Sequence, residues 1–336
     1  MSKAELPSIP SDQLGRNLRD IRISLTDQCN LRCGYCMPAD VFTPEYQYLA
    51  NDDLLTFDEI AKVVEVFVAC GGKKVRLTGG EPLLRKDVPD LIRILKDIQG
   101  VEEVALTTNG LLLPKYIKPM VDAGLDRVTL SLDALDDSIF QQMSGKAVSV
   151  KQVLVGMDWA QDTGIPVKVN SVILRGINDS QVLPLAEFFK NRSEILRFIE
   201  FMDVGNCNGW SKIQVYSAAE ILNDLKSQFD LEPVGANYVG EVAKRYRYLD
   251  GSGEIGIISS VTQPFCRDCN RARLSADGKL YTCLFASLGH DLRKVLRSGG
   301  DLEMALTEIW QARNDRYSEL RGNAVEKKIE MSYIGG

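Results

Sequence analysis

The sequence predicts an α/β fold, an incomplete (β/α)6 barrel of the TIM type with a C-terminal α+β region closing its open side. The first observation behind this prediction is that six short, apolar, strand-like runs alternate with amphipathic helical stretches between residue 21 and about residue 230. Such alternation is typical of a parallel sheet. The second observation is that polar residues follow every run, as at the C-terminal rim of a barrel, where functional groups lie. Six strands are too few for a closed eight-stranded barrel, and no switch point of a doubly wound sheet is evident.

The first helical stretch, residues 57–70, carries clear boundary signals. Thr56 and Glu59 have the spacing of a capping box, and Gly71 stands where a helix should end. The pattern predicts further helices at 88–98, 150–163 and 180–191, and strands at 21–26, 74–78, 103–108, 127–132, 167–173 and 197–201. After residue 230 it predicts a hairpin (244–249 and 254–261) and then helical stretches over 292–313. We expect an N-terminal tail (1–16), a partial barrel (17–230) and a C-terminal region (231–336).

Composition excludes several classes of function. A net charge of −6 argues against a nucleic-acid partner. The chain has one histidine, His290, which excludes His-rich zinc sites and makes a histidine-based catalytic triad improbable. There is no apolar signal segment near the start and no apolar run of about 18 residues, so we expect a cytoplasmic protein without a membrane partner. Eight cysteines in such a chain indicate metal or redox chemistry rather than disulfides.

Three cysteines, Cys29, Cys33 and Cys36, follow the first strand-like run with Cys-x-x-x-Cys-x-x-Cys spacing. A structural zinc site normally has four protein ligands, and no fourth cysteine or histidine lies nearby. A cubane iron–sulfur cluster also usually takes four thiolates. Three thiolates would leave one iron free to bind a molecule other than protein. The spacing therefore predicts a [4Fe–4S] cluster with an open, reactive iron, with a zinc knuckle as the weaker alternative.

Cys266, Cys269 and Cys283 form a second group of three. A zinc ribbon usually has two cysteine pairs, so only half of one is present, although His290 could complete a zinc site. A second cluster with an open iron is the favoured interpretation. Arg271 and Arg273 alternate across Ala272 beside this group, so in an extended segment they point to the same side.

Basic residues also lie on or beside the strand-like runs, where an unpaired charge is costly. They are Arg22, Lys74, Arg76, Lys168 and Arg197. Their position predicts an anionic ligand such as a polyphosphate or a carboxylate. No Walker-type loop is present, and the G-x-G-x-x-G pattern at residues 251–256 precedes a strand-like run, so we expect a hairpin turn there.

The cysteine spacing of the first group, with Tyr35 before its last cysteine, resembles the radical S-adenosylmethionine (AdoMet) superfamily. Gly79-Gly80-Glu81-Pro82 follows the second run and resembles the site for the AdoMet amine, since glycines allow close backbone approach and Glu81 can face a cation. Taken alone, that motif could also be a simple turn. The resemblance implies that an electron from the cluster cleaves AdoMet to a 5′-deoxyadenosyl radical, which abstracts hydrogen from a substrate.

The two cysteine groups, residues 74–82, Arg271-Ala272-Arg273 and the terminal Gly335-Gly336 resemble the molybdenum cofactor biosynthesis protein A (MoaA) family, the GTP 3′,8-cyclases, over about residues 15–336. The resemblance implies that the radical abstracts hydrogen from the ribose C3′ of GTP and that C3′ then attacks guanine C8, an early step of molybdenum cofactor biosynthesis. It also implies two [4Fe–4S] clusters, the second binding the guanine edge.

The resemblance also implies roles for individual residues. AdoMet is expected near Tyr35, Gly80, Glu81, Ser131 and Met202. GTP is expected against a larger set, Arg22, Lys74, Arg76, Thr107, Lys168, Arg197, Arg271, Ala272 and Arg273, with Arg197, Arg271 and Arg273 as the catalytic residues. Gly335 and Gly336 are expected to reach into the active site, although sequence alone favours a frayed terminus.

Expected partners are GTP, a reductant protein such as flavodoxin or ferredoxin, and cyclic pyranopterin monophosphate synthase downstream, with a homodimer possible. Two other functions stay open at this point. One is a radical AdoMet enzyme with an auxiliary cluster that modifies a peptide. The other is a two-cluster electron carrier or zinc-stabilised binding module.

Overall fold

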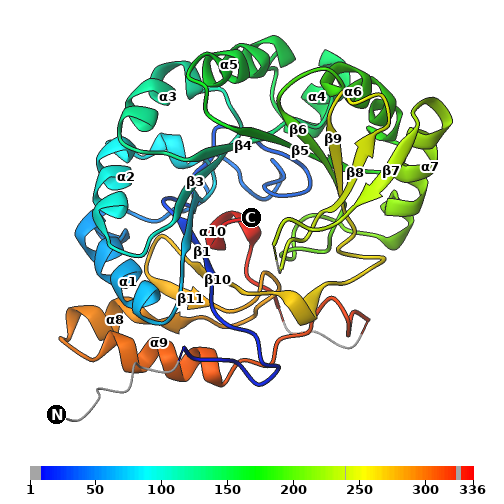
Figure 1. Cartoon of the computed structure of the whole chain (residues 1–336). Coiled ribbons are helices and arrows are strands. Elements are labelled where there is room, and N and C mark those ends of the chain that lie inside the picture. Colours follow the sequence, from blue (N-terminus) through cyan, green and yellow to red (C-terminus); the bar gives the residue numbers. More distant parts are fainter. Residues whose placement is uncertain (1–8, 239, 323–326) are drawn as a thin grey trace.

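The computed structural model describes residues 9–238, 240–322 and 327–336, and its strands form one twelve-stranded sheet. The sheet curves into an open barrel with helices along its outer face (Figure 1). From edge to edge the strand order is β12-β11-β10-β1-β2-β3-β4-β5-β6-β9-β8-β7. The strands are β1 (Asp20–Ser24), β2 (Lys74–Thr78), β3 (Glu103–Thr108), β4 (Arg127–Ser131), β5 (Val167–Ile173), β6 (Ile195–Glu200), β7 (Leu231–Val234), β8 (Lys244–Tyr248), β9 (Glu254–Ile258), β10 (Arg271–Leu274), β11 (Lys279–Tyr281) and β12 (His290–Asp291).

Neighbouring strands from β10 through β1–β6 to β9 pair in parallel, as the alternation of strands and helices predicts. The C-terminal region adds strands to both edges of this parallel core. β9, β8 and β7 lie beyond β6, and β10, β11 and β12 lie beyond β1. Within the described residues β12 and β7 do not pair with each other, so the barrel stays open. The prediction of an incomplete barrel is confirmed.

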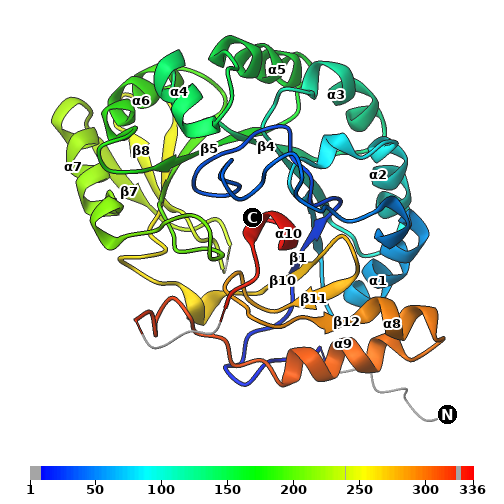
Figure 2. The same ribbon diagram turned by 180° about the vertical axis from the view of Figure 1, so that it is seen from behind.

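The helices cover the outside of the sheet, as Figure 2 shows from the opposite side. They are α1 (Phe57–Ala69), α2 (Val88–Asp97), α3 (Leu113–Asp122), α4 (Asp137–Ser144), α5 (Val150–Asp162), α6 (Val182–Phe189), α7 (Ala218–Gln228), α8 (Leu292–Arg297), α9 (Leu302–Gln311) and α10 (Met331–Ile334), with short 3-10 turns at Asn51–Asp53, Pro82–Leu84, Asp179–Gln181, Lys212–Gln214 and Cys266–Asp268. Both bonds of the capping box between Thr56 and Glu59 are present at α1. No helix in the described part of the chain is long and apolar enough to cross a lipid bilayer.

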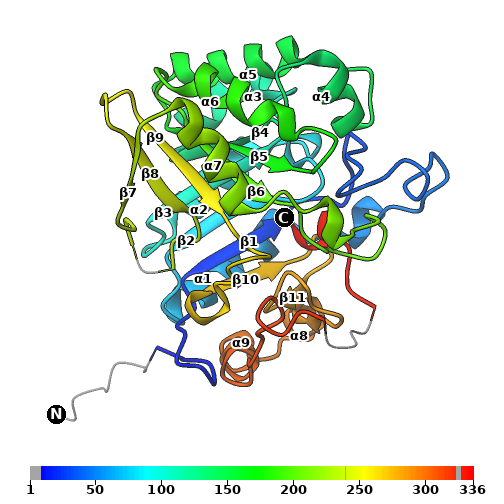
Figure 3. The same cartoon turned by 90° about the vertical axis from the view of Figure 1, so that its right-hand side faces the viewer.

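The hydrophobic core lies between the sheet and its outer helices. Apolar side chains at alternate positions of the strands, such as Ile21, Val75 and Val104, are fully buried there with Phe67 and Leu91 of the helices. Because successive side chains of a strand point to opposite faces, the intervening polar residues face the barrel lumen. Figure 3 shows α8 and α9 packed outside β10 and β11. The lumen is therefore lined by the polar half of each strand.

Candidate active site in the barrel lumen

The first cysteine group lies on the loop that follows β1. Cys29, Cys33 and Cys36 are free and half-buried, and a tight turn brings the backbone N–H groups of Cys36 and Met37 to the Cys33 carbonyl at 2.9 and 2.8 Å. Burial raises the pKa of Cys29 to about 11, and the pKa of Cys33 is also raised, by burial and then by the charges of Asp133, Cys29 and Cys36. These thiols therefore lie close together on a partly buried loop.

The residues fit a cubane cluster better than a single ion. Among the described residues no three Cys, His, Asp or Glu side chains converge on one metal-ion position. Three ligands of a cubane bind three different irons, so their sulfurs need not converge on a point. Cys29, Cys33 and Cys36 are the residues that would hold such a cluster at the rim of the lumen.

The glycine turn after β2 rests directly on the cysteine loop. Gly80 N donates to the Thr26 carbonyl and Glu81 N to the Gln28 carbonyl, both at 2.8 Å. A Cβ atom on Gly80 would lie 2.2 Å from the Gln28 oxygen, and one on Gly79 2.4 Å from the Thr26 oxygen. Any side chain at either position would push the two loops apart, which explains the glycine pair.

Glu81 turns its carboxylate inward rather than leaving it on the surface. It accepts hydrogen bonds from Thr108 Oγ1 at 2.8 Å, Asn109 N at 2.8 Å and Leu83 N at 3.1 Å. Burial raises the pKa of Glu81 to about 7 in spite of these three donors. The carboxylate thus ties the second rim loop to the third.

Two rim residues to which the sequence assigned no role connect the cysteine loop to the barrel. Asn109, after β3, donates from Nδ2 to Asn30 Oδ1 at 2.7 Å and lies 3.9 Å from Cys29 Sγ. Asp133, after β4, accepts a bond of 2.9 Å from the Tyr35 hydroxyl and one of 2.8 Å from Val172 N. Both residues follow strand ends, which is where functional residues of a barrel are expected. A position after a strand does not, however, predict which loop the side chain contacts.

Arginines from three adjacent strands form a row across the lumen. The strand register puts Arg22 directly beside Arg273 on one side and Arg76 on the other. Burial lowers the pKa of all three, that of Arg273 to about 10. Neighbouring arginines lower the pKa of Arg22 and Arg273 further, whereas Asp20 partly offsets the effect of burial on the pKa of Arg76. The Nε atoms of Arg22 and Arg76 are buried without a hydrogen-bond partner. Like charges placed side by side are destabilising, and the unpaired donors of this row have the chemistry to hold an anion.

Further basic residues continue the lining. Burial and then Arg127 lower the pKa of Lys168 to about 8, and burial and then Arg76 lower that of Arg197 to about 9. Arg197 Nε is also buried without a partner. Gly256 of β9 lies beside Arg197 of β6, and a Cβ atom on Gly256 would lie 2.9 Å from Arg197 Cγ. The absent side chain makes room for the guanidinium.

Lys74 differs from the other predicted ligands because it has a carboxylate partner. Its Nζ lies 3.1 Å from Glu103 Oε2 and 4.2 Å from the centre of the Tyr238 ring. Glu103 also pairs with Arg127. Glu103 and Arg127 begin β3 and β4, and no sequence pattern singles out either residue. Thr107 faces the same lumen from β3. Ser131 ends β4, and Met202 follows β6, which ends at Glu200.

The second cysteine group lies beside β10, where Cys266 and Cys269 flank a short turn. Burial alone would raise the pKa of Cys269, but the charges of Arg271 and Arg313 outweigh it and lower the pKa to about 6. Arg271 Nη2 lies 3.5 Å from Cys269 Sγ. In contrast, burial and the charge of Asp315 raise the pKa of Cys283 to about 12. A thiolate beside an arginine is suited to binding a metal centre.

The C-terminal residues enter the lumen instead of fraying (Figures 1 and 2). Arg273 Nη1 donates to the Gly335 carbonyl at 2.5 Å. Gly335 has a φ of +75°, and its position against Thr78 leaves no space for a Cβ atom. The start of this segment is held by Asn206, whose side chain bonds both the N–H and the carbonyl of Lys328 and also Glu330. The tail is thus fixed at both ends.

Comparison with known proteins agrees with this arrangement. Residues 23–189 match the family model of the radical SAM superfamily, and residues 195–319 match the Molybdenum Cofactor Synthesis C model. The chain is 49% identical to a GTP 3′,8-cyclase of Acidothermus cellulolyticus, covering 97% of this chain and 98% of that protein. It is 48% identical to a GTP 3′,8-cyclase of Staphylococcus aureus with the same coverage. The chain belongs to the GTP 3′,8-cyclase family.

The fold of this GTP 3′,8-cyclase family member is also found in a distant solved structure. SuiB of Streptococcus suis, in a crystal structure with bound S-adenosylmethionine, matches with a TM-score of 0.63 at 15% identity. The match covers 91% of this chain and 68% of SuiB. At that identity the likeness concerns the fold alone, and it supports the open barrel described above. Membership of the radical SAM superfamily implies one [4Fe–4S] cluster and AdoMet.

Proposed function

We propose that this protein is a radical AdoMet enzyme that cyclises GTP to 3′,8-cyclo-7,8-dihydro-GTP in molybdenum cofactor biosynthesis. The observation that carries the proposal is the row Arg273–Arg22–Arg76, which shares the lumen with the first cysteine group. When bound, the cluster and AdoMet supply a 5′-deoxyadenosyl radical, which takes hydrogen from ribose C3′ before that carbon bonds guanine C8. The chain's own residues hold AdoMet and GTP in a fixed relative position and exclude water from the lumen.

For AdoMet we propose the rim residues Tyr35, Gly80, Glu81, Ser131 and Met202. Gly80 allows the methionine end to approach the backbone, because nothing projects from its Cα. Ionised Glu81 would offset the charge of the AdoMet amine from behind the turn. The buried bond between Tyr35 and Asp133 fixes the loop that carries the cysteines.

For GTP we propose a set that lines the lumen from Lys168 to β10. Arg22, Arg76 and Arg197 offer unpaired Nε donors to phosphate oxygens. Lys74 acts with Glu103 at the edge of this set, and Thr107 lines the wall between the charges. The side chain of Ala272 is buried in the core on the opposite face of β10, so Ala272 would contribute its backbone alone. Arg197, Arg271 and Arg273 are the proposed catalytic residues. Arg271 lies beside Cys269 and Arg273 bonds the Gly335 carbonyl of the tail, whereas Arg197 has a buried Nε without a partner.

We further propose that Cys266, Cys269 and Cys283 hold a second [4Fe–4S] cluster whose open iron binds the guanine edge. Gly335 and Gly336 would then complete the substrate site from the tail. A flavodoxin or ferredoxin is the proposed electron donor, and cyclic pyranopterin monophosphate synthase the consumer of the product. Eight free cysteines suit a reducing compartment, so we propose that the protein works in the cytoplasm, with a homodimer as its possible assembly.

The test is anaerobic incubation of reconstituted protein with AdoMet, a reductant and GTP, followed by detection of 5′-deoxyadenosine and the cyclised nucleotide. We expect both products from the natural chain and neither from Cys29→Ser. Cys70→Ser is the matched control, because Cys70 is buried beside α9 and contacts Thr307 rather than the lumen. Formation of 5′-deoxyadenosine without any cyclised nucleotide would overturn the assigned substrate.

A further inference from the structure

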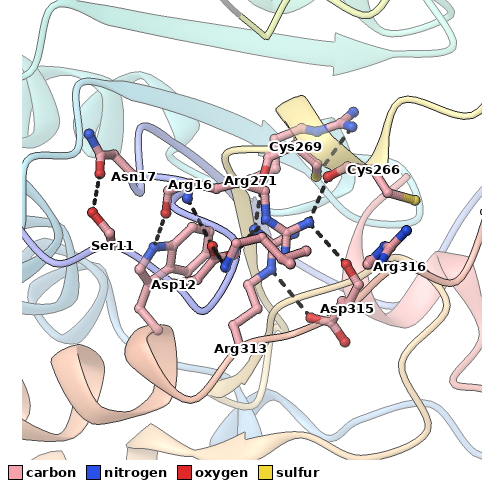
Figure 4. Close-up of polar contacts among 12 residues, drawn as sticks. Ser11, Asp12, Arg16, Asn17, Cys266, Cys269, Arg271, Arg313, Asp315 and Arg316 are labelled. Carbon is pink, nitrogen blue, oxygen red and sulfur yellow. Dashed lines mark hydrogen bonds and ion pairs between the residues drawn. The ribbon is translucent and has the colours of Figure 1, made fainter.

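A buried ion network lies behind the second cysteine group and joins three distant parts of the chain. Asp12, Arg16 and Arg313 are 6%, 5% and 4% exposed. Asp12 Oδ2 lies 2.6 Å from Arg16 Nε and 3.3 Å from Arg313 Nη1. Figure 4 shows both arginines in polar contact with this carboxylate.

Each arginine also holds one cysteine of the pair by its backbone. Arg16 Nη1 donates to the Cys266 carbonyl at 2.6 Å, and Arg313 Nη1 donates to the Cys269 carbonyl at 2.7 Å. Arg16 Nη1 also donates to the Asp315 carbonyl at 2.9 Å. The two ends of the cysteine turn are therefore linked to each other through one buried carboxylate.

The surroundings keep this network rigid. Trp310 Nε1 donates to the Arg16 carbonyl at 2.8 Å, and the Arg313 guanidinium stacks 4.5 Å from the Trp310 ring centre. Asp12 Oδ1 accepts bonds from Leu14 N and Arg16 N, both at 2.9 Å. Charge-assisted hydrogen bonds in a dry interior are stronger than neutral ones, and removing one partner of a buried network is costly.

We propose that Asp12, Arg16 and Arg313 are positioning residues for the second iron–sulfur cluster. They act as a brace that fixes the Cys266–Cys269 turn and the charge around Cys269, and thereby set how firmly that cluster is retained. The inference rests on the proposed second cluster and assigns to the N-terminal segment a function beyond that of a tail. Asp12, Arg16 and Arg313 touch the cysteine backbone and not the reacting atoms.

The test separates the two clusters by removing one cysteine group at a time. In a chain with Cys29, Cys33 and Cys36 changed to Ala, all cluster iron and sulfide belongs to the second group. In the converse chain, with Cys266, Cys269 and Cys283 changed to Ala, they belong to the first. Arg313→Gln, Arg313→Lys and the nearly isosteric Asp12→Asn are then introduced into both chains. Iron and sulfide release to a chelator is timed, and the spectrum of the reduced cluster is recorded.

We expect Arg313→Gln and Asp12→Asn to speed release from the second group by about tenfold or more, with a changed spectrum and no change at the first group. Arg313→Lys, which keeps the charge but not the planar fork, should give a smaller effect. Arg316→Gln is the matched control, since Arg316 is partly exposed and pairs with Glu319 at 2.6 Å.

Two results would refute the positioning role while leaving the second cluster in place. One is an unchanged rate of iron and sulfide release and an unchanged spectrum in both Arg313→Gln and Asp12→Asn. The other is equally faster release from both cysteine groups, which would indicate a general loss of stability. A first-group-free chain that binds no iron and sulfide at all would instead refute the second cluster, and the brace with it.

Discussion

Gly335 allows a direct test of whether the C-terminal tail (residues 327–336) must lie in the lumen. One substitution adds a methyl group at Gly335, and a second removes the Thr78 methyl group with which it would overlap. An L-residue in the left-handed region costs about 1–2 kcal/mol, and Gly335 has a φ of +75°. A Cβ atom there would also lie 2.4 Å from Thr78 Cγ2. Gly335→Ala therefore adds backbone strain and an overlap with a single methyl group. Thr78→Ser removes that methyl group and keeps the hydroxyl, so the double variant retains only the strain.

The strain alone corresponds to a factor of about 5–30 in the equilibrium between seated and released tail. We expect Gly335→Ala to form 5′-deoxyadenosine but little cyclised nucleotide, and the double variant to recover part of the product per 5′-deoxyadenosine. Both compounds are measured in the same anaerobic reaction, with Thr78→Ser alone as the control. This reasoning would be refuted if Gly335→Ala formed as much cyclised nucleotide as the unaltered chain. It would also be refuted if the double variant recovered no cyclised nucleotide while Thr78→Ser alone was active.

Four other perturbations have expected outcomes. Asn206→Ala removes three hydrogen bonds to Lys328 and Glu330. Amide hydrogen exchange over residues 327–334 should therefore become about tenfold faster or more. Lys212→Ala, on the exposed neighbouring turn, is the control and should leave this exchange rate unchanged. Because the pKa of Lys168 is lowered to about 8, the ammonium form proposed to bind phosphate is present below pH 8 and lost above it. The KM for GTP should therefore rise as the pH rises through 8, and Lys168→Arg should remove this rise. Cys283→Ser should retain 5′-deoxyadenosine formation and lose the cyclised product, and full product yield would contradict the role of the second group. Arg22→Gln should raise the melting temperature without nucleotide and abolish the further rise caused by GTP; a lower melting temperature would show that the charge row is not strained.

The sequence predicted most accurately what depends on short-range pattern. Strand and helix periods placed the six barrel strands within a few residues of their observed bounds, and the capping box located the start of α1. The glycine turn next to the cysteine loop was predictable because Gly79 and Gly80 tolerate contacts that exclude every other residue. Local geometry alone determines these features.

Features that depend on strand order could not be derived from local pattern. Alternation indicates that Arg271 and Arg273 share a side, but only the pairing of β10 with β1 puts Arg273 beside Arg22. In the same way, the register of β2 with β3 places Glu103 opposite Lys74 and gives that lysine a partner. The contact of Asp12 with Arg313 spans nearly the whole chain, and no spacing rule connects two such distant residues.

The row formed by Arg273, Arg22 and Arg76 lowers the stability of the fold, and the rest of the molecule has to offset this cost. Arg22 lies between two other guanidinium groups and has a lowered pKa, so the row carries unfavourable charge interactions. A polyphosphate bound there would supply the missing negative charge, and a ligand that binds only the folded state stabilises it by mass action. If GTP binds at this row as proposed, binding offsets the loss of stability that the row causes, which is the usual relation between stability and activity at a functional site. The helices outside the sheet and the strands added at both edges supply the apolar burial that makes this row tolerable.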